Sequence, residues 1–227
     1  MNFPDHLLPS GLLWAANVLG FLMLAFTAWV APWKRLVDGG DRLNVWLGMC
    51  VGLMLLWSIK TGIRPGLNFH LLGATLFALM FGARLALIGM AVVLAGVTLA
   101  GAAGWTSFGV NWILTGLLPV TLSMLIYSLV DRKLPNHLFV YIFLNAFVGA
   151  GLVVVATGLA ITLMLDLSEI YSGSYLTQNY LPYYILMGWS EAMLTGMAVT
   201  LMTAFRAEWL STFSDVRYLK TKPGHVD

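Results

Sequence analysis

Charged residues are scarce in this chain, and cysteine is almost absent. Only 10% of the 227 residues are Asp, Glu, Lys or Arg, whereas an average soluble domain has about 25%. The single cysteine, Cys50, lies in an apolar run, which excludes a disulfide framework and a cysteine-based metal cluster. The formal net charge is only +2, and the basic residues form no stripe, so nucleic-acid binding is not expected.

Sequence motifs of enzymes are also missing. The chain has no GxxxxGK[ST] phosphate-binding loop, so any ATP-driven process requires separate subunits. It has no HExxH motif, no paired aspartates within apolar runs and no Ser/His pair at matched depth, so an intramembrane enzyme is not expected. The N-terminus lacks a basic region, and its apolar run continues to Trp33, which is longer than the roughly 7–15 residues of a signal peptide. We therefore expect a non-enzymatic protein that retains its first hydrophobic segment.

Hydrophobic residues make up 59% of the chain and gather in runs separated by short polar joints. A bilayer core about 30 Å thick needs ~20 apolar residues for each helical span. The runs therefore predict an all-α, polytopic membrane bundle of about seven spans. The predicted spans are residues 11–33, 43–59, 70–82, 84–103, 108–130, 138–165 and 181–205.

The third predicted span, residues 70–82, is too short to cross a bilayer as a helix. We interpret it as a half-span that continues into the next helix, or as a re-entrant segment covered by protein. The remaining organisation is simple. We predict one transmembrane domain over residues 1–213 and a cytoplasmic tail over residues 214–227.

Basic residues at the ends of the spans predict the orientation of the bundle. With the N-terminus outside, ten Lys and Arg residues lie on the cytoplasmic side, whereas Lys60 and Arg64 lie outside. The ten are Lys34, Arg35, Arg42, Arg84, Arg132, Lys133, Arg206, Arg217, Lys220 and Lys222. The C-terminus is then cytoplasmic. The N-terminal segment and the loops that precede residues 70, 111 and 181 share the external face, where they can meet.

Polar side chains at membrane depth are candidate functional groups, because burial without a partner costs several kcal/mol. Glu191 lies in the middle of the last predicted span. It is either an ion ligand or proton acceptor, or a structural carboxylate that accepts hydrogen bonds from Thr or Asn on neighbouring helices. His70 opens the short third span, and Asn111 and Asn145 lie in or near the fifth and sixth spans.

The N-terminal segment is stiff and apolar, because Pro4 and Pro9 enclose several hydrophobic residues. Such a segment is expected to pack rather than to remain in solvent. If it folds back into the bundle, the amine of Met1 and the side chain of Asn2 or His6 converge with His70. Nitrogen ligands in that number suit Ni(II), Cu(II) or Co(II).

Four segments, in order, resemble the CbiM/NikM family, the substrate-capturing membrane subunits of energy-coupling-factor cobalt and nickel transporters. The start, MNFPDHLLP, resembles the family's MHIPDGxLxP, and HLLGATLFALMFG is similar to its HxTGxxLxAxLxG. SFGVNWILTGLLP is similar to LGANTFxMxxxGP, and WSEAMLTGMAVTLMTAFRAEWL resembles EGxxTxxxVxxLxxxRPxxL. The resemblance covers roughly residues 1–213.

In that family the N-terminus inserts into the bundle and a metal is held near it. The ligands are the terminal amine, the histidine at position two and the histidine that opens the third segment. The resemblance thus implies Met1 and His70 as ligands. Asn2 departs from the family, since an amide is a poorer ligand than imidazole, and His6 stands where the family has glycine. Asn111 and Glu191 match family positions that imply supporting roles.

The resemblance implies a permease subunit in the plasma membrane of a prokaryote. It would capture a divalent transition metal, nickel or cobalt ahead of copper, at the external face. Separate ATPase and transmembrane coupling subunits would drive uptake; the metal is then the substrate, and no permanent cofactor is expected. One alternative is a solitary, diverged metal channel or sensor without these partners. A further alternative is an apolar small-molecule carrier lined by Trp105, Trp112 and Trp189.

Overall fold

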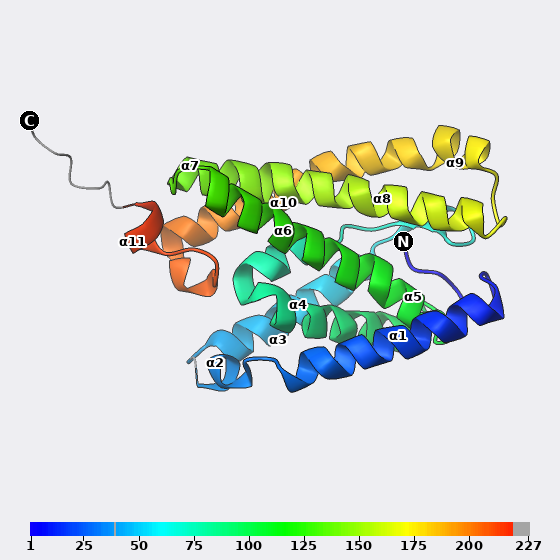
Figure 1. Ribbon diagram of the computed structural model, residues 1–227, viewed down its shortest axis with the longest axis horizontal. Helices are drawn as coiled ribbons and strands as arrows, with labels where there is room; N and C mark the ends of the chain where they lie inside the picture. Colours follow the sequence, from blue (N-terminus) through cyan, green and yellow to red (C-terminus); the bar gives the residue numbers. More distant parts are fainter. Residues whose placement is uncertain (39, 220–227) are drawn as a thin grey trace, which may run out of the picture.

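The computed structural model describes residues 1–38 and 40–219, and most of these residues are helical (Figure 1). Lys220 and Lys222, two of the cations used to predict the orientation, lie outside the described residues. The elements, in chain order, are α1 (Ser10–Trp29), α2 (Trp33–Val37), α3 (Arg42–Ser58), β1 (Thr61–Arg64), β2 (Leu67–Phe69), α4 (Ala74–Leu99), α5 (Phe108–Trp112), the π-helix η1 (Ile113–Leu117), α6 (Leu118–Lys133), α7 (Leu138–Val140), the π-helix η2 (Tyr141–Val148), α8 (Gly149–Leu167), α9 (Gly173–Asn179), α10 (Leu181–Phe205), the 3₁₀ turn η3 (Ala207–Trp209) and α11 (Asp215–Tyr218).

Five helical stretches are long and apolar enough to cross a membrane. They are residues 10–29, 74–99, 108–133, 138–167 and 173–205, and α3 is a shorter apolar helix of 17 residues. Large hydrophobic side chains on α1 face outwards, since Trp14 and Phe21 are each 72% exposed. A water-soluble protein rarely exposes such a continuous apolar surface, whereas lipid contact explains it. The chain is therefore a multi-pass membrane protein.

Helix α4 is broken at Gly82 and reverses its direction there. Leu53 packs against Gly73, whereas its neighbour Met54 packs against Gly96. A straight helix would separate Gly73 from Gly96 by about 35 Å, so adjacent residues of α3 could not contact both. Gly82 has non-helical dihedral angles, φ 75° and ψ 168°, between the two arms. Residues 74–81 thus form a first arm that runs antiparallel to α3, and residues 83–99 form a second arm parallel to it, as predicted for the short third span.

The four segments expected to share one face do meet at one end of the bundle. The backbone N–H of Gly104 donates to the carbonyl of Phe3 in the N-terminal segment (3.1 Å). The hydroxyl of Tyr171 donates to the carbonyl of Pro65 in the β-hairpin (2.9 Å). Figure 1 places the N-terminus inside this end, beside the hairpin and the start of α5. The prediction that these segments converge is confirmed.

The residues between α3 and α4, which we expected to be a loop, form a two-stranded antiparallel hairpin. Pro65 and Gly66 occupy its turn, and Gly66 has the positive φ (78°) that such a turn requires. The all-α class therefore has one small exception. Helix α1 also ends earlier than predicted, at Trp29, because Pro32 interrupts the run and α2 begins after it.

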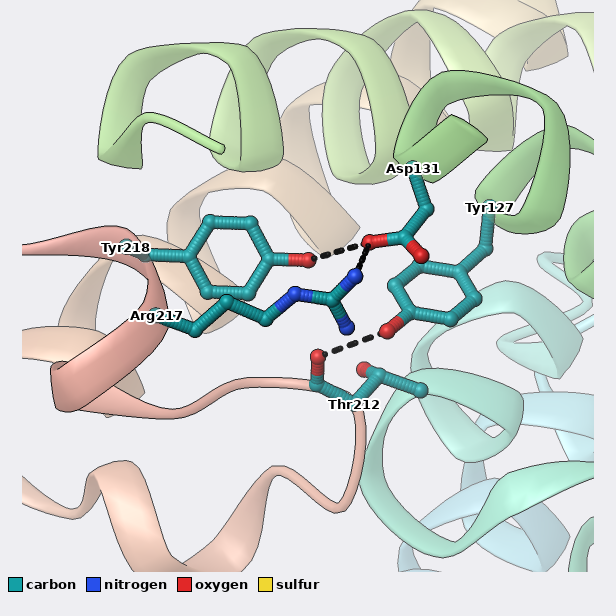
Figure 2. A network of polar contacts seen from close by, with 5 residues as sticks. All are labelled: Tyr127, Asp131, Thr212, Arg217 and Tyr218. Carbon is teal, nitrogen blue, oxygen red and sulfur yellow. Dashed lines mark hydrogen bonds and ion pairs between the residues drawn. The ribbon is translucent and has the colours of Figure 1, made fainter. Parts of the chain in front are cut away.

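At the opposite end, the segment that follows α10 folds back onto the bundle. Figure 2 shows Arg217 and Tyr218 both reaching Asp131 of α6, while the hydroxyl of Tyr127 donates to the carbonyl of Thr212. Tyr218 is buried. Residues 214–219, which we assigned to the tail, are thus packed against the bundle, whereas residues 220–227 lie outside the described part of the chain. The division of the chain at residue 213 stays a prediction.

We expect Gly82→Ala to destabilise the protein. The added Cβ has room, since its nearest neighbour is Ser211 Oγ at 3.8 Å, but the backbone conformation at Gly82 is accessible almost only to glycine and costs an L-residue about 1–3 kcal/mol. Gly52→Ala in α3 is the control, because a Cβ there meets nothing within 4 Å and alanine favours helix. Thermal unfolding in detergent should show a lower midpoint for Gly82→Ala only. An unchanged midpoint would contradict the reversal at Gly82.

Candidate functional site

The N-terminal segment is inserted into the bundle rather than exposed. Met1, Asn2 and Phe3 have exposed fractions of 0%, 1% and 0%. The amino group of Met1 donates to both the carbonyl and the side-chain oxygen of Asn68 in β2. The amide of Asn68 also pairs with the backbone of Asn2, accepting from its N–H (3.0 Å) and donating to its carbonyl (2.8 Å). The Asn68 side chain thus satisfies the Met1 amine and both backbone groups of Asn2, as a neighbouring strand would do.

The side chain of Asn111 pairs with the backbone of the third residue in the same way. Its Oδ1 accepts from the N–H of Phe3 (2.7 Å), and its Nδ2 donates to the carbonyl of Phe3 (3.1 Å). Asn111 lies in α5 and is completely buried. Its position matches the supporting role implied by the family resemblance, because it fixes the backbone that carries Met1 and Asn2.

A third set of contacts fixes the N-terminal segment at Asp5, where the segment leaves the interior. The N–H and hydroxyl of Thr106 both donate to Asp5 Oδ1, at 2.8 and 2.6 Å. These hydrogen bonds lower the pKa of the Asp5 carboxyl group. A Cβ at Gly104 would overlap the backbone and carboxyl group of Asp5, so the close approach of these two segments requires glycine.

His70 lies on the same segment as Asn68, two residues further along, so an extended backbone directs both side chains to one side. It is 3% exposed, and its ring packs on Trp57 with 4.5 Å between centroids. Nδ1 lies 3.1 Å from the carbonyl of Leu71, while Nε2 is buried without a hydrogen-bond partner. Since a carbonyl can only accept, Nδ1 carries the proton in this arrangement and Nε2 presents a lone pair, as in a metal-binding histidine.

Glu191 of α10 supports the backbone next to His70. Its carboxylate accepts from the N–H groups of Leu72 (2.9 Å) and Gly73 (2.6 Å), at the start of the first arm of α4. A carboxylate at a helix N-terminus satisfies N–H groups that have no helical partner and complements the helix dipole. Of the two roles left open by the sequence, this geometry favours the structural carboxylate, with backbone N–H groups rather than Thr or Asn as donors.

The Met1 amine and His70 therefore lie close together in the interior, and we call Met1, His70 and the adjacent buried Asn2 the buried cluster. Burial, followed by the nearby Lys60 ammonium group, lowers the pKa of the Met1 amino group well below its usual value, which favours the neutral amine that can bind a metal. The amine is also close enough to His70 for electrostatic interaction between them. Both polar side-chain atoms of Asn2 are buried without a hydrogen-bond partner, like Nε2 of His70.

His6 does not join this cluster. It is exposed, has a positive φ (66°), and lines a surface hollow with Trp14, Asn17 and Trp105 at the start of α1. Within residues 1–38 and 40–219, no group of three or more His, Cys, Asp and Glu side chains could hold a metal. The buried cluster thus contains a single imidazole, and the assignment of Met1, Asn2, His6 and His70 as metal ligands stays a prediction.

Sequence reasoning missed Asn68, which makes more contacts with the N-terminus than Asn111 does. The available signal was its spacing of two residues from His70, which places both side chains on one side of an extended segment. Because the sequence did not predict the hairpin, the spacing could not be used to infer that Asn68 and His70 face the same side.

Comparison with known proteins identifies similar structures and a family. Two crystal structures are similar: one described as a transition metal transporter (TM-score 0.69, 18% identity, covering 90% of this chain and 93% of the other), and one described as a truncated transition metal transporter (TM-score 0.63, 21% identity, 90% and 99%). At these identities they establish the shared fold. No curated protein gives a significant match. The family CbiM, described as the cobalt uptake substrate-specific transmembrane region, matches residues 2–209. Since that match spans most of the chain, the protein belongs to the CbiM family.

Proposed function

We propose that this protein captures a divalent transition metal at the external face of a prokaryotic plasma membrane for uptake. One observation carries the proposal. The inserted N-terminus buries the Met1 amine near His70, and the next residue, Asn2, has a buried side chain that, like His70 Nε2, has no protein partner. Buried polar groups without hydrogen bonds are costly, and a bound cation would compensate the two that offer lone pairs, Asn2 Oδ1 and His70 Nε2. Membership in a family described by cobalt uptake supports the same function.

The ligand types favour cobalt or nickel, with copper as a further candidate. The Met1 amine and His70 Nε2 are nitrogen donors, and the Asn2 side chain offers its amide oxygen. Imidazole and amine ligands suit late first-row divalent metals. Asn2 supplies a weaker donor than the histidine implied by the family resemblance, so we expect a lower affinity than an imidazole at that position would give.

Directional uptake requires an orientation and an energy source. The reversal of α4 at Gly82 supports the predicted seven passes, because its two arms then count separately, and an odd number of passes puts the N-terminus and α11 on opposite sides of the membrane. Lys60 and Arg64 lie near the buried cluster that contains Met1, whereas the end that contains Gly82 has more arginines. Because basic residues are enriched on the cytoplasmic side of membrane proteins, this distribution supports an external metal site. Separate ATPase and transmembrane coupling subunits would drive transport. A solitary channel or sensor is the alternative; metal uptake by cells that express this chain alone would favour it.

We expect His70→Ala to abolish metal binding without loss of membrane insertion, because it removes the only imidazole of the cluster. His6→Ala is the matched control, since His6 is exposed and lies outside the cluster. The measurement is metal content by mass spectrometry, after incubation with nickel, cobalt, copper or zinc, of protein purified without an affinity tag or chelator. Normal metal content in His70→Ala would refute the site, and loss in His6→Ala would place the ligands elsewhere.

Replacing Asn2 tests the departure from the family. Asn2→His should increase the affinity about tenfold or more, which corresponds to ~1.4 kcal/mol, because imidazole is a stronger donor to these metals. Asn2→Ala should decrease it. Isothermal titration with cobalt and nickel gives both values, and a lower affinity for Asn2→His than for the unaltered chain would mean that residue 2 does not face the metal.

We expect Glu191→Gln to weaken metal binding about 10–100-fold, as do changes to residues that orient a ligand. The amide offers one acceptor where the carboxylate supplies two, so one of the two N–H groups of Leu72 and Gly73 is left unpaired and the His70 segment shifts. Ser190→Ala is the control, because Ser190 is exposed and bonds only within α10. Unchanged affinity in Glu191→Gln, with normal expression, would show that this carboxylate does not position His70.

A further inference from the structure

A hollow of about 540 Å³ lies at the end of the bundle opposite the metal cluster. Its walls come from α2, α3, the Gly82 turn of α4, α6 and the segment after η3. Arg35, Arg42 and Arg84 line it, together with Tyr127 and Thr212. Figure 2 shows these last two held together by a hydrogen bond, at the place where the C-terminal segment folds back onto α6.

The three arginines have no carboxylate partner. Among the described residues, the only ion pairs within 4.0 Å join Arg206 to Glu208 and Arg217 to Asp131. Arg84 donates to the carbonyl of Val30 at the end of α1 (3.1 Å), which leaves further N–H groups of its guanidinium available. Two acidic residues, Asp38 and Asp41, lie in the connection between α2 and α3, but neither lines the hollow. Three uncompensated cations around one hollow favour an anionic ligand.

The backbone of the hollow also favours an anion. Gly82, Ala83, Arg84 and Leu85 line it, and the second arm of α4 begins there. The N-terminus of a helix carries a partial positive charge, and phosphate groups commonly bind at such positions. Guanidinium groups match phosphate with two parallel hydrogen bonds, so arginine is the preferred residue for phosphate recognition.

Apolar side chains also line the hollow, namely those of Pro32, Leu36, Phe81, Leu85 and Met124. On α2, next to the hollow, Trp33 and Val37 are exposed. Tryptophan is enriched at membrane–water interfaces, at the level of lipid headgroups. A site that combines cations with an apolar floor at this level fits the headgroup and upper acyl chains of a phospholipid.

We propose that this hollow binds the phosphate headgroup of an anionic phospholipid. The ligand contacts Arg35, Arg42 and Arg84, and the apolar residues accommodate the adjoining part of its acyl chains. Because the Gly82 turn and the Ser211–Thr212 segment form part of the wall, a bound lipid holds these two elements together and stabilises the fold. This site is independent of the metal cluster and of the proposed function.

The test uses the purified full chain, stripped of lipid in a neutral detergent and transferred to nanodiscs of phosphatidylcholine with or without phosphatidylglycerol. Native mass spectrometry measures retained lipid, and thermal unfolding measures its effect. Phosphatidylglycerol should be retained in preference to phosphatidylcholine and should raise the unfolding midpoint. Each arginine removed should reduce the retained phosphatidylglycerol about fivefold.

The variants are Arg84→Gln and the double variant Arg35→Gln with Arg42→Gln. The double variant leaves the Arg84 contact with Val30 intact, so it tests the site even if Arg84→Gln fails to fold. Arg206→Gln is the control, because Arg206 lies at the same end of the bundle but does not line the hollow. Equal retention by the double variant and the control overturns the proposal. Stabilisation by inorganic phosphate alone, equal to that by phosphatidylglycerol, would replace the lipid by a free anion and also overturn it.

Discussion

The fold depends on the need to satisfy backbone hydrogen bonds where the chain is broken inside the bundle. In a bilayer, non-helical backbone is tolerated only if protein or a water-filled cavity covers it. Residues 70–82 break the helical pattern twice, at Gly73 and at Gly82, and both residues have positive φ. At the first break Glu191 accepts from Leu72 and Gly73; at the second, Ser211 and Thr212 donate to the carbonyls of Met80 and Leu79. Both ends of the short first arm of α4 are thus held by α10 and its continuation.

This arrangement explains how polar groups are held in the interior of an otherwise apolar bundle. The first arm is only about two turns long, and the extended residues before it present His70 sideways into the interior. Asn68, on the same extended segment, binds the backbone of Met1 and Asn2, while Asn111 binds that of Phe3. Both asparagine side chains are neutral amides, so they hold the N-terminal segment in the interior without adding a charge there. The positions of Met1 and Asn2 therefore follow from backbone pairing with buried asparagines.

The two ends of the bundle differ in chemistry in a way that follows from the same break. One end contains the Met1 amine, the Asn2 amide and the His70 imidazole, which offer lone pairs to a cation. The other end, at the Gly82 turn, gathers three arginines and the N-terminus of the second arm, which are donors to an anion. The first arm of α4 connects the two ends directly, since His70 precedes it and Gly82 ends it. Glu191 binds the start of this arm and Thr212 binds its end, so both ends of the arm are fixed by contacts with α10 and the segment that follows it.

The sequence alone determined the membrane class, the approximate limits of the helices and the short third span, because hydrophobic length and glycine position are local properties. It also predicted that His70, Asn111, Asn145 and Glu191 are polar side chains at membrane depth, and all four are buried. Only the tertiary structure decided what these residues contact. Asn68 was overlooked because its partner is 66 residues away, and His6 seemed equivalent to Asn2 because sequence distance does not reveal that a positive φ at His6 leaves its side chain at the surface. The arginine-lined hollow likewise exists only after the Gly82 turn brings α2, α3 and the C-terminal segment together. Each of these features depends on contacts between distant segments, which no local pattern specifies.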